Sequence, residues 1–228
     1  MAVEEGITEI IATSHALHPL FHADGGEVIR QVEQLNREIT SLKLPIKIHI
    51  GHEVRLSDDI VRLLKERKLH TLAESKYLLL ELPSQGIPPY TIDIIQELLL
   101  VNIIPIIAHP ERNRSIAENP TRLKRLIEHG AIAQITSGSL AGHFGRAIQK
   151  LSIQLLEANL VHTYGSDVHN SQSRPYKFDQ GLRQLEKHKM LDMVDVLLEN
   201  NARIIENEEI ILLEPQEFEK KKWWNLFS

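Results

Sequence analysis

Strand-like apolar runs alternate with helix-like amphipathic segments along most of this 228-residue chain. The runs are short and rich in β-branched residues, as in IIATS and IPIIA, and residues 26–44 show the apolar spacing of a helix. Repeated strand–helix units with nearly continuous apolar strands are typical of a parallel sheet that is covered by helices. The alternation therefore predicts an α/β fold.

The number of strand-like runs limits the architectures that are possible. About six can be counted, fewer than the eight of a standard closed barrel. A distorted or incomplete barrel is the first expectation, and an open doubly wound sheet is the second. A short edge element is expected at residues 209–214. Because no linker divides the chain, we expect a single domain over residues 1–219 and a short tail over residues 220–228.

Composition excludes several classes of protein. A net charge of −5 and a pI near 6.2 argue against nucleic-acid binding, which needs a broad basic surface. The absence of cysteine excludes a thiolate nucleophile and a cysteine-type zinc site. No apolar run is long enough to cross a bilayer, and the first residues are acidic where a signal peptide is basic. We expect a cytoplasmic protein.

Histidine and carboxylate residues stand where the apolar runs end. They are His15, Glu53, Glu81, His109, Asp167 and His169. In a parallel α/β fold the C-terminal ends of the strands gather at one face, so residues that are far apart in sequence should converge there. Imidazoles and carboxylates together predict a metal site with more than one divalent ion. For any one of these residues alone, a solvated strand end is the alternative.

Two arginines are candidates for binding phosphate. Arg112 lies in HPERNR and Arg174 in SRPY, and a guanidinium group matches phosphate oxygens in two-point contacts that lysine cannot make. Surface salt bridging is the alternative for both. The small-residue segment from Thr136 to Gly142 could admit a substrate or simply join a strand to a helix. No GxGxxG, Walker or GxSxG motif supports nucleotide or serine-nucleophile chemistry.

The segments IIATSH, IIPIIAHPERNR, QITSGSLAGHFGR, LLEANLVHTYGSDVHN and SRPY resemble those of the PHP (polymerase and histidinol phosphatase) phosphoesterases, in the same order. Within that superfamily the resemblance is to the metal-dependent protein-tyrosine phosphatases of bacterial capsule and exopolysaccharide operons. It implies a distorted (β/α)7 barrel that holds up to three divalent ions, often manganese. It also implies that water activated by the metal attacks phosphotyrosine on a bacterial tyrosine kinase.

The resemblance implies roles for the residues named above. The metal ligands would be His15, Glu53, Glu81, His109, Asp167 and His169. Arg112 and Arg174 would hold the phosphoryl group. The loop residues His18 and His22 could lie near the site, but nothing in the sequence makes them ligands.

The sequence departs from the family at its first strand. The family begins with a strand that ends in His-x-His, followed by a loop with an Asp, and this sequence contains neither. Either the sequence is truncated or the protein has lost part of its site, and the sheet would then have an unpaired edge. Two further functions therefore stay open: a weakly active or non-catalytic homologue that binds the kinase, and a small-molecule phosphoesterase such as a histidinol phosphatase.

The last residues form a basic and aromatic segment. Lys220, Lys221 and Lys222 precede Trp223, Trp224, Leu226 and Phe227. Lysines can meet anionic headgroups, and indole rings favour the membrane boundary. Peripheral membrane contact is one expectation for this tail, and packing of its aromatic residues on protein is the other.

Overall fold

The computed structural model describes residues 1–21 and 23–218. Within this part of the chain six parallel strands form one sheet whose spatial order is the chain order. The strands are β1 (Glu9–Ala16), β2 (Lys47–Arg55), β3 (Tyr77–Glu81), β4 (Ile104–Ala108), β5 (Ile132–Thr136) and β6 (Thr163–Gly165). A doubly wound sheet would reverse its strand order. The incomplete barrel is therefore the expectation that is confirmed.

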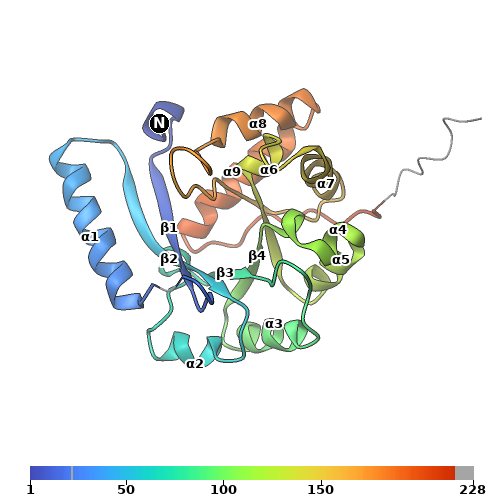
Figure 1. The fold of residues 1–228 in the computed structure, drawn as a ribbon, viewed down its shortest axis with the longest axis horizontal. Helices are drawn as coiled ribbons and strands as arrows, with labels where there is room; N and C mark the ends of the chain where they lie inside the picture. Colours follow the sequence, from blue (N-terminus) through green and yellow to red (C-terminus); the bar gives the residue numbers. More distant parts are fainter. Residues whose placement is uncertain (22, 219–228) are drawn as a thin grey trace, which may run out of the picture.

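Helices surround the curled sheet (Figure 1). The α-helices are α1 (Gly25–Ser41), α2 (Ile60–Lys65), α3 (Thr91–Leu100), α4 (Arg114–Glu118), α5 (Thr121–Glu128), α6 (Ser137–Leu140), α7 (Arg146–Glu157), α8 (Phe178–Lys187) and α9 (Leu191–Ile205). Three short 3-10 helices are η1 (Val3–Glu5), η2 (Leu72–Glu74) and η3 (Pro110–Arg112). No helix in the described part of the chain is long and apolar enough to cross a membrane.

Alternate residues of β3, β4 and β5 enter two different apolar clusters. On β3, Leu78 and Leu80 pack beneath the outer helices, whereas Tyr77 and Leu79 face the inner side of the curled sheet, where Ile204 of α9 joins them. All five residues of β3 are buried. Burial on both faces explains why the strands read as continuous apolar runs.

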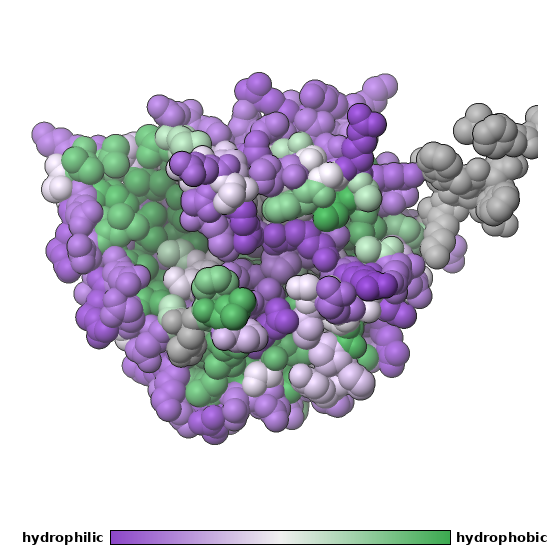
Figure 2. All heavy atoms as spheres, viewed as in Figure 1, coloured by the Kyte–Doolittle hydropathy of each residue, from purple (hydrophilic) through white to green (hydrophobic). Residues whose placement is uncertain are grey.

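The helix α1 forms a separate contact with the first two strands. Its Val28, Val32 and Ile39 pack with Ile48 in a small cluster of their own. Figure 2 shows hydrophobic side chains over this side of the molecule, between α1 and the strands. The outer edge of β1 pairs with no strand among the described residues. The outer edge of β1 is thus the open side of the barrel.

One expected element is wrong, and one region is not described. Residues 209–214 form no strand, because Asn200 satisfies the backbone of Ile211 in place of a neighbouring strand: Ile211 N donates to Asn200 Oδ1 (2.7 Å), and Asn200 Nδ2 donates to Ile211 O (2.9 Å). Residues 219–228, which include the expected tail, and His22 lie outside the described residues. The expectations for them stay predictions.

Candidate metal centre

The register of the sheet brings three of the expected ligands together. His15 of β1 lies opposite Glu53 of β2, and Arg55 of β2 lies opposite Glu81 of β3. Because Glu53 and Arg55 are two residues apart, they share one face of the strand, and that face is the inner one, on which Leu79 packs. One ligand atom each from His15, Glu53 and Glu81 lie within 4.8 Å of one another. Three neighbouring strands therefore supply a compact donor set.

Two atoms of this donor set are buried without a hydrogen bond. They are His15 Nδ1 and Glu81 Oε2. The other carboxylate oxygen of Glu81 is 3.2 Å from Arg55 Nη1. A buried polar atom without a partner costs about 1–3 kcal/mol, and a cation between an imidazole and two carboxylates would remove that cost. The residues present therefore fit a divalent metal ion.

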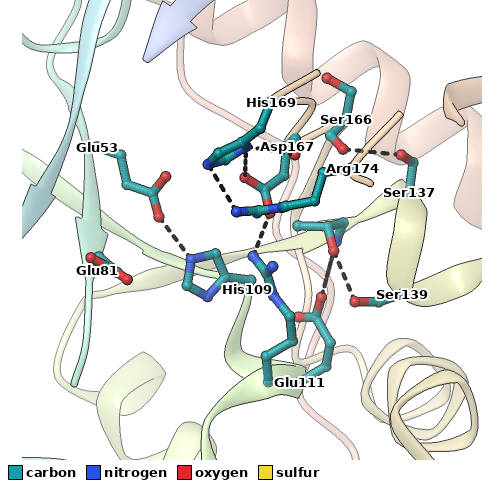
Figure 3. A network of polar contacts seen from close by, with 12 residues as sticks. Glu53, Glu81, His109, Glu111, Ser137, Ser139, Ser166, Asp167, His169 and Arg174 are labelled. Atoms are coloured by element: carbon teal, nitrogen blue, oxygen red, sulfur yellow. Dashed lines mark hydrogen bonds and ion pairs between the residues drawn. The ribbon is translucent and has the colours of Figure 1, made fainter. Parts of the chain in front are cut away.

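His109 extends this set from the next strand end. It follows β4 in a left-handed conformation (φ 34°) and donates a hydrogen bond from Nε2 to Glu53 Oε1 at 2.7 Å (Figure 3). Burial alone would raise the pKa of Glu53, but the hydrogen bond and charge of His109, together with the charge of His15, lower it overall. Glu53 is therefore ionised at neutral pH, as a metal ligand must be.

Asp167 and His169 form an adjoining group with the two arginines. Arg112 Nη2 donates to Asp167 Oδ2 at 2.5 Å, and Arg174 Nη2 donates to the same oxygen. Arg174 Nη1 also donates to His169 Nε2 at 2.8 Å. His169 Nε2 in turn lies 3.4 Å from His15 Nε2. Burial opposes ionisation of Asp167, but the neighbouring cations, Arg112 first, lower its pKa overall. Both arginines thus point at one anionic oxygen beside the metal donors.

A hydrogen-bonded turn returns Arg174 to the site. Asn170 Oδ1 accepts bonds from the backbone nitrogens of Gln172, Ser173 and Arg174 at 3.0, 2.7 and 3.2 Å. His169 N donates to Arg174 O at 3.1 Å and closes the loop. Asn170 was not among the residues predicted from the sequence. Asparagine side chains often accept hydrogen bonds from backbone N–H groups a few residues later, and this property could have indicated its role.

Glu111 is a second site residue that was not predicted from the sequence. It is 1% exposed, and its Oε1 accepts bonds from Thr136 Oγ1 (2.8 Å) and Thr136 N (3.3 Å). Thr136 Oγ1 also bonds Ser139 Oγ at 2.8 Å. This network joins η3, which carries Arg112, to the end of β5 (Figure 3). The small residues that follow form the buried helix α6, so the segment joins strand to helix and does not form an open loop.

Arg55 was missed as well, although its position carried a signal. It lies two residues after Glu53 on an expected strand, so both side chains had to share a face.

A cavity of about 570 Å³ reaches the site from the open side of the barrel, and its lining includes Glu53, His109 and Asp167. The contacts described above bring all the expected ligands and both arginines into one region.

An incomplete parallel barrel with imidazole and carboxylate groups at its strand ends belongs to the class of metal-centred α/β barrels. The chain is a member of the CpsB/CapC family of capsular polysaccharide synthesis, whose family model matches residues 1–206. It is 38% identical to the tyrosine-protein phosphatase YwqE of Bacillus subtilis over 226 residues, and this match covers 99% of this chain and 89% of YwqE. CapC of Staphylococcus aureus is 37% identical over 226 residues, which make up 99% of this chain and 89% of CapC.

A solved structure has the same fold. A chain from the crystal structures of YwqE of Bacillus subtilis and CpsB of Streptococcus pneumoniae, described as unique metal-dependent tyrosine phosphatases, superposes with a TM-score of 0.92. The two chains are 38% identical, and the match covers 96% of this chain and 89% of that one. The family resemblance and the fold expected from sequence are confirmed.

Proposed function

We propose that this chain is a metal-dependent protein-tyrosine phosphatase of capsular polysaccharide synthesis, acting on phosphotyrosine in a bacterial tyrosine kinase. The observation that carries the proposal is the pair of arginines, Arg112 and Arg174, which meet at one anionic oxygen beside the imidazole and carboxylate donors. The relation to proteins named as tyrosine phosphatases supports the same activity.

Each group has a distinct part in the proposed site. The metal ligands are His15, Glu53, Glu81, His109, Asp167 and His169. Arg112 and Arg174 bind the phosphoryl oxygens, because their guanidinium forks fit the geometry of phosphate. The chemistry that divalent ions supply in such sites is charge neutralisation and a lowered pKa of water. We take manganese as the ion because the family resemblance implies it, and nitrogen and oxygen donors without thiolate are compatible with it.

Hydrolysis of a phosphotyrosine peptide in the presence of Mn²⁺ tests the proposal. Phosphoserine and histidinol phosphate serve as comparison substrates, because a small-molecule phosphoesterase would prefer the latter. We expect release of phosphate from phosphotyrosine and from p-nitrophenyl phosphate, and its loss after chelation. Turnover that survives chelation, or that favours histidinol phosphate, would contradict the proposed activity.

A kinase-binding protein with weak or no turnover is the second candidate. It is favoured by the fact that the described residues contain a single compact group of three donors. Such a protein would bind a phosphotyrosine peptide through Arg112 and Arg174 without cleaving it. Equilibrium binding and phosphate release, measured on the same peptide, separate the two candidates.

The same proposal assigns parts to the segments of the chain. Residues 1–219 would act as one cytoplasmic phosphoesterase domain, and residues 220–228 would form a tail that meets the membrane. The support for the tail is its sequence of three lysines followed by large apolar side chains.

A further inference from the structure

The turn between α6 and α7 carries two aromatic rings toward the arginines. Gly142 (φ 79°) and Gly145 (φ 95°) bracket His143 and Phe144 with left-handed backbone, which side chains rarely adopt. The two rings pack edge to face, with centroids 5.0 Å apart. We call residues 142–145 the His143–Phe144 turn. Its glycines allow a tight reversal that presents both rings together.

Phe144 lies against Arg112. The guanidinium carbon is 5.1 Å from the centroid of the Phe144 ring, within the range of a cation–π interaction. Gly138 of α6 leaves room for this ring, because a Cβ at position 138 would lie 3.0 Å from Phe144 Cε2. The ring therefore occupies a site that the neighbouring helix keeps open.

The guanidinium group of Arg112 also bonds Asp167, which is itself an expected metal ligand. Arg112 Nη2 bonds Asp167 Oδ2, whereas the buried Nε of Arg112 has no hydrogen-bond partner in the described part of the chain. When phosphoryl oxygens take the place of the Asp167 oxygen, the face of the Phe144 ring is the contact that stays. The ring can thus set the plane of the guanidinium group before phosphate arrives.

His143 supports the segment of the second arginine. Its Nε2 donates a hydrogen bond of 2.8 Å to the carbonyl oxygen of Ser173, the residue before Arg174. The same Ser173 donates its backbone N–H to Asn170 Oδ1. One turn therefore contacts both arginine-bearing segments, which are more than sixty residues apart in the sequence.

We propose that the His143–Phe144 turn is a positioning element that sets the two phosphate-binding arginines relative to each other. Phe144 fixes the guanidinium plane of Arg112, and His143 fixes the segment that carries Arg174. The inference rests on the proposed function, because it takes the arginines as the groups that bind the phosphoryl oxygens. Phosphate affinity should then depend on the face of the Phe144 ring.

Substitutions at position 144 separate the ring face from apolar bulk. Phe144→Leu keeps a large apolar side chain and removes the aromatic face, and Phe144→Tyr keeps the face. The readouts are inorganic phosphate binding by calorimetry on the Mn²⁺-loaded protein, and KM for p-nitrophenyl phosphate. We expect Phe144→Leu to weaken phosphate binding about fivefold, with KM rising more than kcat falls. Phe144→Tyr should restore binding to within about twofold.

A double-mutant cycle with Arg112 makes the test specific. In an Arg112→Ala background Phe144→Leu should have almost no further effect, because its partner has gone. Equal effects of Phe144→Leu in both backgrounds, or wild-type binding by Phe144→Leu, would overturn the positioning role. Thermal melts identify a general loss of stability.

The cycle also distinguishes this inference from the proposed function. If Arg112→Ala leaves phosphate affinity unchanged, Arg112 does not bind phosphate, and the proposed function loses its support there. If Arg112→Ala weakens binding but Phe144→Leu does not, only the positioning inference is wrong. His143→Ala should raise KM, and His143→Gln, which keeps a donor, should recover part of the loss.

Discussion

Glu53 and His109 are joined by a 2.7 Å hydrogen bond between the C-terminal ends of β2 and β4. The two strands are not neighbours in the sheet, since β3 lies between them. The bond therefore reaches across the end of β3, where Glu81 stands. It also lowers the pKa of Glu53 against the effect of burial. This pair ties the expected ligands of nonadjacent strands into one centre.

We predict that His109→Ala abolishes turnover of p-nitrophenyl phosphate and weakens Mn²⁺ binding by at least about tenfold. The variant removes an expected ligand and the bond that keeps Glu53 ionised. Steady-state kinetics and a metal titration measure the two effects. His129→Ala is the control, because His129 is partly exposed just after α5 and its side chain bonds the local Arg125 carbonyl. Activity of His109→Ala equal to that of the control would place the site elsewhere.

The arginine substitutions should lower kcat/KM. Arg112→Lys keeps the charge but loses the guanidinium fork, and Arg174→Ala loses both. We expect each to reduce kcat/KM by at least tenfold, or roughly 1.4 kcal/mol of transition-state binding. Arg37→Lys is the matched control, because Arg37 is on α1 with a side chain that is 71% exposed. If both site variants behave like the control, surface salt bridging is the correct interpretation.

Metal content is expected to be below the three ions that the family resemblance implies. The described residues bring only His15, Glu53 and Glu81 into one compact donor group, while Asp167 is paired with two arginines. Elemental analysis after dialysis against buffer gives the number of tightly held ions per chain. Three tightly held ions would show that the remaining residues complete further sites.

The strand ends could be predicted from sequence because the relevant signals are local. A buried parallel strand is apolar throughout, so the first charged residue marks where it ends, as Glu81 does after YLLL. Parallel order then places such residues on one face, without knowledge of side-chain contacts. The candidate ligands and the barrel class follow from these rules.

The pairings inside the site could not be predicted in the same way. Glu111 contacts Thr136, and His143 contacts Ser173, and both pairs depend on how loops and helices pack in three dimensions. The segment 209–214 also looked like a strand, yet a single side chain, Asn200, satisfies the backbone of Ile211. Hydrophobic patterns carry no information about such long-range polar contacts.

The tail prediction rests on sequence, because residues 219–228 lie outside the described structure. We expect the full chain to co-sediment with anionic vesicles and its tryptophan emission to shift to the blue, since Trp223 and Trp224 follow three lysines. A chain that ends at Glu219 is the control and contains no tryptophan. Equal sedimentation of the two, with no blue shift in the full chain, would leave packing on protein as the explanation.

The final prediction concerns His162, which lies outside the metal centre. Its side chain is buried, and its Nδ1 accepts a hydrogen bond from Ala133 N at 3.1 Å. Burial lowers the pKa of His162 from 6.5 to about 4. Between these values the unfolded chain binds a proton that the folded chain does not, so stability falls as the pH drops from 6.5 toward 4. The loss attributable to His162 should be about 2 kcal/mol at pH 5.

Urea unfolding at pH 7 and pH 5 measures this loss, and His162→Asn is the matched variant. Asparagine keeps an acceptor near the position of Nδ1 but cannot titrate. The lowered pKa values of Glu53 and Asp167 contribute little in this window, because both carboxyls are ionised in the folded and unfolded states above about pH 5. The parent should therefore lose more stability than the variant between the two pH values. Parallel losses would mean that His162 is protonated in the folded protein as readily as in the unfolded chain.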